Sequence, residues 1–532
     1  MLTKGANSKE KIDELLIHKD LLKHLVKGEK KMLKFLKREA NTAYTANGAV
    51  SNASTMSDNL DFFATAGALR NVSDEEITER FIRAFAEDRD IAMKTLFYAR
   101  DIRGGLGERR AFRVIIRYLA DNYPETARKN IANIAEYGRY DDILSLIGTA
   151  SEAEAIAYIR ETLEKDMVSM QAQRPVSLMA KWLPSVNASS WETVRLAKKI
   201  AKAMHMSDAS YRRMLSALRS YIKILENNLR EKDYSFYYES QPSKALFKYR
   251  RAFIRNDEER YAAFIERAKK TPCVMNTSTL TPYDIVNRII KSGTAGIPAF
   301  GRDNFKSSLS AEEKEVLDVT WNALENYVNS DNTLVVVDGS GSMYAGRFSV
   351  KPIAVAESLG IYFAERNRGA FKDHFITFSA NPRLVEIKGK DIFEKVKYAM
   401  SYNECSNTNI EKTFNLILNT AVKNRLKQKD MPSRLLIVSD MEFDSAASNS
   451  SKTNFENAKA KFEKNGYKLP QLVFWNVNSF NRQQPVKMND RGTILVSGMS
   501  PQIFAMLKDD KFDPYTFMMS VLNAARYERI AA

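Results

Sequence analysis

The residues best suited to chemistry stand where an apolar run ends, within residues 334–342. The run LVVV is followed by Asp338-Gly-Ser340-Gly-Ser342, which puts one carboxylate and two hydroxyls on a turn loosened by glycine. β-Branched residues favour a strand, so these side chains follow directly from a strand end. Hard oxygen ligands of this kind suit Mg²⁺. The spacing predicts a metal site built for binding, with no catalytic group beside it.

Two more oxygen ligands are expected downstream. Thr408 lies in SNTNIEKTF, and Asp440 ends the strand-like run LLIVSD. Together Asp338, Ser340, Ser342, Thr408 and Asp440 resemble the metal-ion-dependent adhesion site of von Willebrand factor A domains. The resemblance implies three loops at the carboxyl ends of parallel strands, where open α/β sheets bind ligands. It also implies bound Mg²⁺, with Mn²⁺ or Ca²⁺ as substitutes; an A-type fold whose site is empty or purely structural is the alternative.

Strand-like and helical patterns alternate through residues 331–532. Short apolar runs predict strands at 334–338, 375–378, 435–438, 472–477 and 494–496. Helical spacing predicts helices at 353–363, from Asp391, from Ile410 and near 454–464. Such alternation indicates a mostly parallel sheet covered on both faces. We therefore expect a von Willebrand factor A-like, Rossmann-type α/β domain over residues 331–532.

Residues 1–330 differ in kind, because strand-like runs almost vanish. Ser73-Asp-Glu-Glu76 is a capping-box pattern, and Ile77, Phe81 and Phe85 mark one face of the helix that follows. Further helices are expected at 91–99, 108–120, 153–164, 192–204, 211–229 and 246–268. Helix pairs of this length suggest an α-helical HEAT-like solenoid over residues 57–330. Residues 1–56 are interpreted as a helical segment followed by a long polar, mobile loop at 41–56.

Length and composition indicate how many domains to expect and which classes of protein are excluded. A chain of 532 residues exceeds what one core usually supports, so two domains are expected. No segment approaches 18 uninterrupted apolar residues, and the start lacks a signal-peptide core, so we expect a cytoplasmic protein without membrane contact. Cys273 and Cys405 are the only cysteines, which argues against a disulfide framework and against cysteine-ligated zinc.

A net charge of +16 points to a polyanionic partner. Arginines crowd the segment RDIRGGLGERRAFR, where two glycines allow the backbone to approach a phosphate closely, and others follow along a later helix. Tyrosines and basic residues interleave in YSFYYESQPSKALFKYRRAFIR, a mixture that suits single-stranded RNA or RNA ends. The alternative is that most of these aromatics are core and the arginines pair with helix acids.

The order of the motifs RDIRGGLGERR, GRYDDIL, KWLPS and SYRRMLSALR, followed by DGSGSM in an A-type domain, resembles the TROVE-module proteins, and within them a Ro-like branch. The resemblance implies a ring of helical repeats whose ends are bridged by the A-type domain. It implies small non-coding or misfolded RNA as partner. The candidate RNA-binding residues, from this resemblance and from the basic clusters, are Arg103, Arg109, Arg110, Arg113, Lys181, Arg212, Arg213, Tyr237, Lys248, Tyr249, Arg250 and Arg251.

Three classes of function remain open. RNA binding, as a ribonucleoprotein scaffold or quality-control factor, is the favoured interpretation. The runner-up is a protein-interaction or assembly module, cellular or viral, in which an acidic side chain of a partner completes the coordination of an ion at Asp338. An enzyme is the least favoured, because the sequence offers no nucleophile–base pair; Asp440, Glu442 and Asp444 come closest to a carboxylate cluster.

Overall fold

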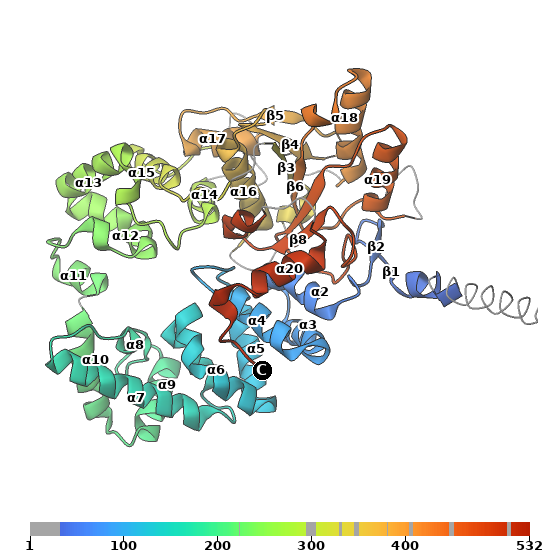
Figure 1. Cartoon of the computed structure of the whole chain (residues 1–532). Coiled ribbons are helices and arrows are strands. Elements are labelled where there is room, and N and C mark those ends of the chain that lie inside the picture. Colours follow the sequence, from blue (N-terminus) through green and yellow to red (C-terminus); the bar gives the residue numbers. More distant parts are fainter. Residues whose placement is uncertain are drawn as a thin grey trace, which may run out of the picture.

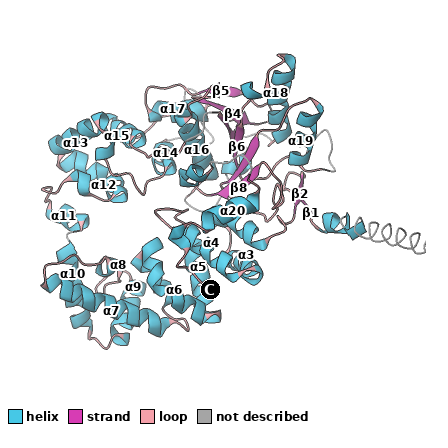
Figure 2. Cartoon of the chain, viewed as in Figure 1, coloured by secondary structure: helices cyan, strands magenta, loops and turns pink. Residues whose placement is uncertain are grey.

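The protein is described by a computed structural model that covers residues 32–33, 35–222, 224–293, 305–328, 332–344, 350–379, 381–403, 408–445, 452–507 and 512–532. Helices make up most of its first part, and the six-stranded sheet lies in its second part (Figure 2).

The helices of the first part follow one another along an arc (Figure 1). We call α2–α15 the helical arc. Its elements are α2 (Asp58–Thr65), η1 (Ala66–Asn71), α3 (Asp74–Glu87), α4 (Arg89–Arg100), α5 (Arg110–Asn122), α6 (Pro124–Tyr137), η2 (Tyr140–Leu146), α7 (Glu152–Gln171), α8 (Met179–Trp182), α9 (Trp191–Ala203), α10 (Asp208–Ile222), α11 (Leu225–Glu231), η3 (Tyr238–Ser240), α12 (Ser243–Asn256), α13 (Glu258–Lys270), η4 (Pro272–Val274), α14 (Pro282–Lys291) and α15 (Ala311–Asn322).

Local sequence signals explain how these helices begin and pack. The side chain of Ser73 accepts a hydrogen bond from the backbone N–H of Glu76 (3.2 Å), as the capping pattern predicts. Ile77, Phe81 and Phe85 are buried on the face of α3 that meets α2 and α4. Burying one apolar stripe per helix is what holds successive helices together.

Two predicted helix boundaries are wrong. The expected helix at 211–229 is divided, because α10 ends at Ile222 and α11 begins at Leu225. The expected helix at 246–268 is two helices that meet at Asp257. The carboxylate of Asp257 accepts hydrogen bonds from Tyr238 (2.7 Å) and Arg260 (3.1 Å), and such local bonds compete with helical backbone pairing.

The second part forms the predicted α/β domain. Strand order is β5-β4-β3-β6-β7-β8, with β5 antiparallel and the other pairs parallel. Its elements are β3 (Thr333–Asp338), η6 (Gly341–Tyr344), α16 (Pro352–Arg366), β4 (His374–Phe378), β5 (Leu384–Glu386), α17 (Ile392–Met400), α18 (Ile410–Lys423), η7 (Gln428–Asp430), β6 (Arg434–Ser439), α19 (Asn454–Lys464), β7 (Gln471–Asn476), β8 (Thr493–Ser497), η8 (Pro501–Met506), α20 (Pro514–Leu522) and η9 (Ala525–Tyr527).

Both faces of the sheet are covered. Val336 and Ile437 pack with α18 and α19 on one face, and Val337 and Val438 pack with α16 on the other. The central parallel strands are buried along their whole length, as is typical of sheets sandwiched between helices. The carboxyl ends of β3 and β6 are thereby held side by side at one edge.

Both ends of the helical arc contact the α/β domain (Figure 1). At one end α2 and η1 lie against β8, and α20 packs against α2 and α4. At the other end α14 packs on α16, and α15 contacts α17. The arc and the sheet therefore close into one ring of contacts, which confirms the predicted curvature of the arc.

Polar contacts join the first end of the arc to the α/β domain. Arg482 Nε donates to Glu76 (2.6 Å) and its Nη1 donates to Glu79 (2.8 Å). This guanidinium lowers the pKa of Glu76 to about 2. Near the end of the chain, Arg526 pairs with the fully buried Asp101 (2.7 Å from Nη2 to Oδ1), which also accepts a hydrogen bond from Tyr527 (3.1 Å).

Arg526→Gln is expected to lower the free energy of unfolding by about 2 kcal/mol, because Asp101 keeps its buried charge and loses its cation. The loss is smaller than for a fully buried pair because the Arg526 side chain is 31% exposed. The matched control is Arg529→Gln, whose side chain is 57% exposed and lies 3.6 Å from Glu136. Chemical denaturation should show a loss of unfolding free energy of less than about 0.5 kcal/mol for that control. Equal losses in the two variants would contradict the role given to Asp101.

The prediction of a mobile loop at 41–56 is wrong. Thr42–Tyr44 (β1) and Val50–Asn52 (β2) pair as an antiparallel hairpin. Asn52 also exchanges backbone hydrogen bonds with Gln484 (3.0 and 2.7 Å). Polar composition suggested a solvated loop, but these polar side chains bond to the α/β domain. Residues 1–31, which the sequence suggests are helical, lie outside the described residues.

Candidate functional site

The loop after β3 is organised around Asp338, which is fully buried. Its Oδ1 accepts a hydrogen bond from the backbone N–H of Ser340 (2.9 Å). Its Oδ2 accepts one from the hydroxyl of Ser439 (2.5 Å), at the end of the neighbouring strand β6. Burial raises the pKa of Asp338 to about 6. A carboxylate held this firmly, with its charge uncompensated, suits a cation.

Asp440 follows β6 and brings a second carboxylate to the same edge. Its Oδ1 accepts a hydrogen bond from the N–H of Glu442 (3.2 Å), whereas its buried Oδ2 has no hydrogen-bond partner among the described residues. Burial, and then the charge of Asp338, raise the pKa of Asp440 to about 7. A buried carboxylate oxygen without a hydrogen-bond partner, next to a second carboxyl group, favours the binding of a cation.

The three hydroxyl residues of the predicted set lie at the same place. The Oγ atoms of Ser340 and Ser342 are 3.0 Å apart, and Thr408 Oγ1 donates to the carbonyl of Glu442 (2.8 Å). Ser340, Ser342, Thr408 and Asp440 line one open pocket of ≈ 360 Å³. The structure thus brings the five sequence-predicted residues to one edge of the sheet, where four of them line the pocket and Asp338 is fully buried.

These residues fit a hard divalent cation. Among the described residues, no three His, Cys, Asp or Glu side chains cluster as metal ligands. An ion here would be held by the carboxylates of Asp338 and Asp440, the hydroxyls of Ser340, Ser342 and Thr408, and water. One or two carboxylates with several waters is the arrangement that Mg²⁺ favours.

Sequence reasoning missed Asn47 in the pocket and left Glu442 without a role. Asn47 comes from the β1–β2 hairpin, 361 positions before Thr408 in the sequence, and lines the pocket beside it. Glu442 Oε1 accepts hydrogen bonds from Asn481 (2.8 Å) and Gln483 (2.7 Å). The position of Glu442, two residues after Asp440, was the one sequence signal that could have placed it at the pocket. No local sequence pattern indicated Asn47.

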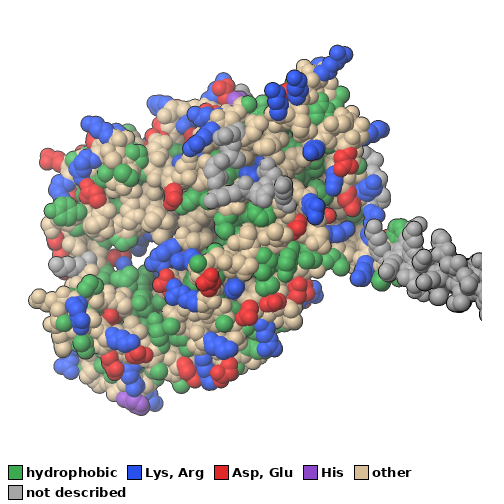
Figure 3. Space-filling view, in the orientation of Figure 1, with side chains coloured by type: hydrophobic (Ala, Val, Ile, Leu, Met, Phe, Trp, Pro, Cys, Tyr) green, Lys and Arg blue, Asp and Glu red, His purple; other side chains and the backbone are tan. Residues whose placement is uncertain are grey.

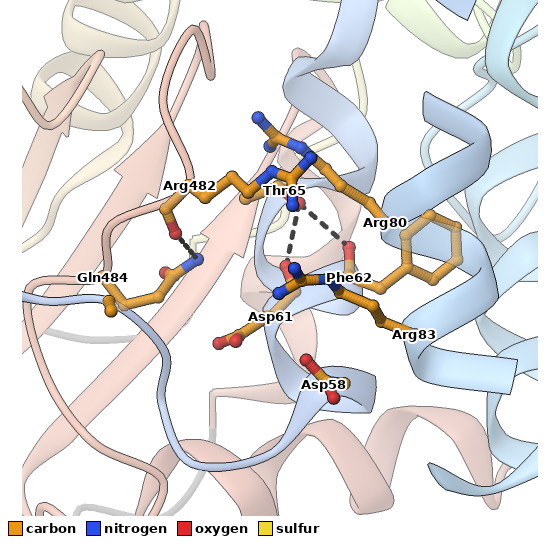
Figure 4. Close-up of a pocket in the computed structure, with 9 residues that line it drawn as sticks. Asp58, Asp61, Phe62, Thr65, Arg80, Arg83, Arg482 and Gln484 are labelled. Carbon is orange, nitrogen blue, oxygen red and sulfur yellow. Dashed lines mark hydrogen bonds between the residues drawn. The ribbon is translucent and has the colours of Figure 1, made fainter. Parts of the chain in front are cut away.

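A second cavity lies between the hairpin, α2 and α3, bounded by Asp58, Asp61, Arg80, Arg83, Arg482 and Gln484 (Figure 4). Burial raises the pKa of Asp61 to about 6. The cavity has room of only ≈ 30 Å³, about that of a single water molecule. We therefore interpret this cavity as a packing gap where these elements meet, and not as a ligand site.

The arginine-rich segment around Gly104-Gly105 is only partly available to a ligand. Arg110 donates to the carbonyl of Val72 (2.6 Å) and pairs with Asp74. Arg113 pairs with Asp141 (2.7 Å) and Asp142 (2.6 Å). Arg103 is exposed and donates to the Glu136 carbonyl (2.8 Å).

Arg109 is also available to a ligand, since it is exposed and makes no ion pair within the described residues. Burial, and then the charges of Arg139 and Arg113, lower its pKa. Arg212 and Arg213 on α10 are also exposed without an ion pair in the part of the chain that the structure describes.

The tyrosine-rich segment is mainly a core, which corrects part of the predicted RNA surface. Tyr238, Phe253 and Phe264 pack together, with the rings of Tyr238 and Phe253 5.1 Å apart. Arg250 is 5% exposed and lies 3.5 Å from Glu313, so it cannot reach a nucleic acid. Arg251 is more exposed and pairs with the same carboxylate (2.7 Å). Hydrophobic burial of the rings explains the aromatic spacing that resembled a stacking surface.

Tyr237 is the exposed exception, with 76% of its surface accessible. It remains available for stacking, and so does the pair Lys248 and Tyr249 on α12. Lys248 Nζ lies 4.7 Å from the centre of the Tyr249 ring and donates to its hydroxyl (2.9 Å).

A run of contacts joins several predicted residues to two that were not predicted. We call Arg139, Lys181, Trp182, Lys248 and Tyr249, together with Arg109, the basic strip; Arg109 is included because the charge of Arg139 acts on it. The guanidinium of Arg139 lies 4.0 Å from the centre of the Trp182 ring, and Lys181 Nζ lies 5.6 Å from it. Lys181 reaches Glu226 (3.6 Å), which accepts a hydrogen bond from Tyr249 (3.1 Å). The strip therefore continues from η2 through α8 and α11 to α12.

Figure 1 places α8 and α12 on the inner side of the arc, on either side of α11. The helices that carry Lys181, Trp182, Lys248 and Tyr249 therefore lie on the concave side of the arc. Of the four cations of the basic strip, Lys181 lies 3.6 Å from Glu226 and Arg139 pairs with Asp141, whereas Arg109 and Lys248 make no ion pair within the described residues.

Comparison with known proteins places the chain in a family. A family model described as a domain of unknown function (DUF2828) matches residues 45–158 and 154–334. The chain belongs to this family. A second model, also a domain of unknown function (DUF7788), matches residues 332–523, the α/β part of this family member.

Two similar proteins span most of the chain. The uncharacterized protein L728 of Acanthamoeba polyphaga mimivirus is 27% identical over an alignment of 526 positions, which covers 91% of this chain and 88% of that protein. The crystal structure of the Ro (Rsr) protein of Deinococcus radiodurans is similar with a TM-score of 0.49 and 14% identity, over 88% of this chain and 99% of that chain.

No helix among the described residues of this DUF2828 protein is long and apolar enough to cross a membrane.

Proposed function

We propose that this protein is a non-catalytic RNA-binding protein that holds single-stranded RNA, or the single-stranded ends of structured RNA, along its basic strip. The observation that carries the proposal is the alternation of cations and planar rings from Arg139 to Lys248. Cations attract the phosphate backbone, and exposed planar groups stack unpaired bases. A role as ribonucleoprotein scaffold or quality-control factor follows from such binding.

The distribution of ion pairs supports the same location. Arg110, Arg113 and Arg251 have their charges balanced by carboxylates at 2.7 Å or less, so they gain little from a phosphate. Within the basic strip, Arg109 has no such partner in the described chain, and Lys181 has only a longer contact to Glu226. Arg139 is paired with Asp141, so its part is the planar guanidinium that lies over Trp182. Cations without a close carboxylate are the ones that release counterions when they bind a phosphate.

Purification at low salt tests this proposal. Nucleic acid should co-purify, giving a high ratio of absorbance at 260 to 280 nm, and should consist of RNA once the sample is digested with RNase or DNase. A protein free of nucleic acid, with no affinity for single-stranded RNA above that for an unrelated polyanion, would contradict it.

A second candidate function is a metal-dependent contact with another protein. We propose Mg²⁺, replaceable by Mn²⁺ or Ca²⁺, as the ion held by Asp338, Asp440 and the three hydroxyl residues. Phe480 favours this candidate, because this large apolar side chain on the rim of the pocket is 42% exposed. An acidic side chain of a partner could complete the coordination while Phe480 is covered.

A further inference from the structure

The tip of the β1–β2 hairpin is fastened to the loop that carries Asp440. The Thr45 hydroxyl donates to the carbonyl of Phe443 (2.6 Å), and the N–H of Ala46 donates to Glu442 Oε2 (2.6 Å). The Ser445 hydroxyl donates to the carbonyl of Gly48 (2.5 Å). Ala49 is buried with the apolar side chains on that face of the sheet. The tip of the hairpin is therefore held firmly in place as one side of the metal pocket.

Asn47 closes a triangle of hydrogen bonds with one proposed ligand. Its Nδ2 donates to Thr408 Oγ1 (2.8 Å) and to the carbonyl of Glu442 (2.6 Å). Thr408 Oγ1 lies 2.8 Å from the same carbonyl. The side-chain amide of Asn47, from the N-terminal hairpin, thus holds both the Thr408 hydroxyl and the Glu442 carbonyl in place.

The hydrogen-bond capacity of a hydroxyl shows what the triangle does. A threonine hydroxyl has one proton to donate and two lone pairs to accept with. In this structure the nearer acceptor for the proton is the Glu442 carbonyl (2.8 Å), Asp444 Oδ1 is a more distant one (3.3 Å), and one lone pair accepts from Asn47. A single lone pair remains for a cation, and its direction is fixed by the other two bonds. Outer partners that fix a ligand in this way raise the affinity for the metal.

We infer that Asn47 is a positioning residue of the metal site, and that docking of the hairpin and binding of the cation strengthen each other. This rests on the proposed Mg²⁺ site. Coupling between two binding events is reciprocal, so the factor by which the docked hairpin raises cation affinity is the factor by which the cation stabilises docking. The N-terminal segment would thus be held more firmly to the α/β domain when the ion is bound.

Calorimetric titration with Mn²⁺ and Mg²⁺ tests the first half of the inference. Asn47→Ala should bind the ion about tenfold or more weakly than the wild type, as is usual when an outer partner of a ligand is lost. Thr42→Ala is the matched control, because within the described residues its hydroxyl bonds to the carbonyl of Arg38 (2.9 Å) and to no group of the pocket. That control should keep the affinity of the wild type.

Hydrogen exchange tests the second half, and its main comparison is the unmutated protein with and without the ion. Peptides that cover residues 41–52 should exchange more slowly with Mn²⁺ than without it, and Asp338→Asn should abolish the difference. The amide of Ala46, which donates to Glu442, should show the largest change.

The possible outcomes separate the two proposals. A wild type that binds no cation would overturn the metal site itself. A wild type that binds the cation, with equal affinity in Asn47→Ala and no change in hairpin exchange, would overturn the inference and leave the hairpin as a structural clamp only. Weaker binding in Asn47→Ala, together with slower exchange on adding the ion, is the expected result.

Discussion

We expect the variant Arg109→Gln, Lys181→Gln, Lys248→Gln to bind single-stranded RNA on the order of 50-fold more weakly than the wild type at 0.15 M salt. Each phosphate neutralised contributes about 0.6 log units at that salt concentration, and three such contacts are lost. None of the three side chains carries a close ion pair among the described residues, so the fold should tolerate the change. Fluorescence anisotropy with a labelled oligonucleotide measures the affinity.

The control for this variant is Lys423→Gln, Lys427→Gln, Lys429→Gln. These lysines are exposed at and just beyond the end of α18, where Lys and Arg gather at the tip of the α/β domain (Figure 3). The change in net charge is the same, but the site is on the other domain. The RNA affinity of the control should fall by less than about threefold, because only a long-range effect of the changed net charge remains. Equal losses in the two triple variants would mean that net charge, and not the basic strip, attracts RNA.

Asp440→Asn should abolish cation binding and at the same time stabilise the metal-free protein at pH 8. Burial and Asp338 raise the pKa of Asp440 to about 7, from an ordinary value of 3.8. The folded protein therefore holds a proton that the unfolded chain gives up, and ionisation costs folding free energy as the pH rises from 3.8 to about 7. The amide removes that cost, so a gain of roughly 2–4 kcal/mol is expected at pH 8 and none near pH 4.

Thermal unfolding at the two pH values, with and without Mn²⁺, measures both effects. Glu463→Gln is the control, because this exposed carboxylate has no ion pair within the described residues and lies outside the pocket. It should change neither cation affinity nor stability. An Asp440→Asn protein that is less stable than the wild type at pH 8 without metal would show that this carboxyl group has a structural role.

The α/β domain could be predicted well because its signals are local. Each central strand is a short apolar run, and the loops with Asp338 and Asp440 follow directly from two of them. Parallel pairing of β3 with β6 then brings the two carboxylates together without further information. The antiparallel edge strand β5 was missed, since its three residues are too few to show an alternating pattern.

The residues that sequence reasoning missed depend on long-range contacts. Asn47 meets Thr408 across 361 positions, in a polar stretch that locally favours a loop. Arg139 and Trp182 come from different elements and meet because α8 packs against η2. Arg250 was misassigned for the opposite reason, because a buried arginine paired with Glu313 has the same local sequence as an exposed one.

The salt dependence of RNA binding tests the central claim most directly. For the wild type, the logarithm of the affinity should fall with the logarithm of salt concentration by about 0.7 per phosphate neutralised. The basic-strip triple variant should flatten that slope by about two units, and the α18 triple variant should leave it unchanged. Trp182→Leu should weaken binding by about 1–3 kcal/mol without altering the slope, because stacking releases no counterions. A slope that is the same for the wild type and the basic-strip variant would contradict the account.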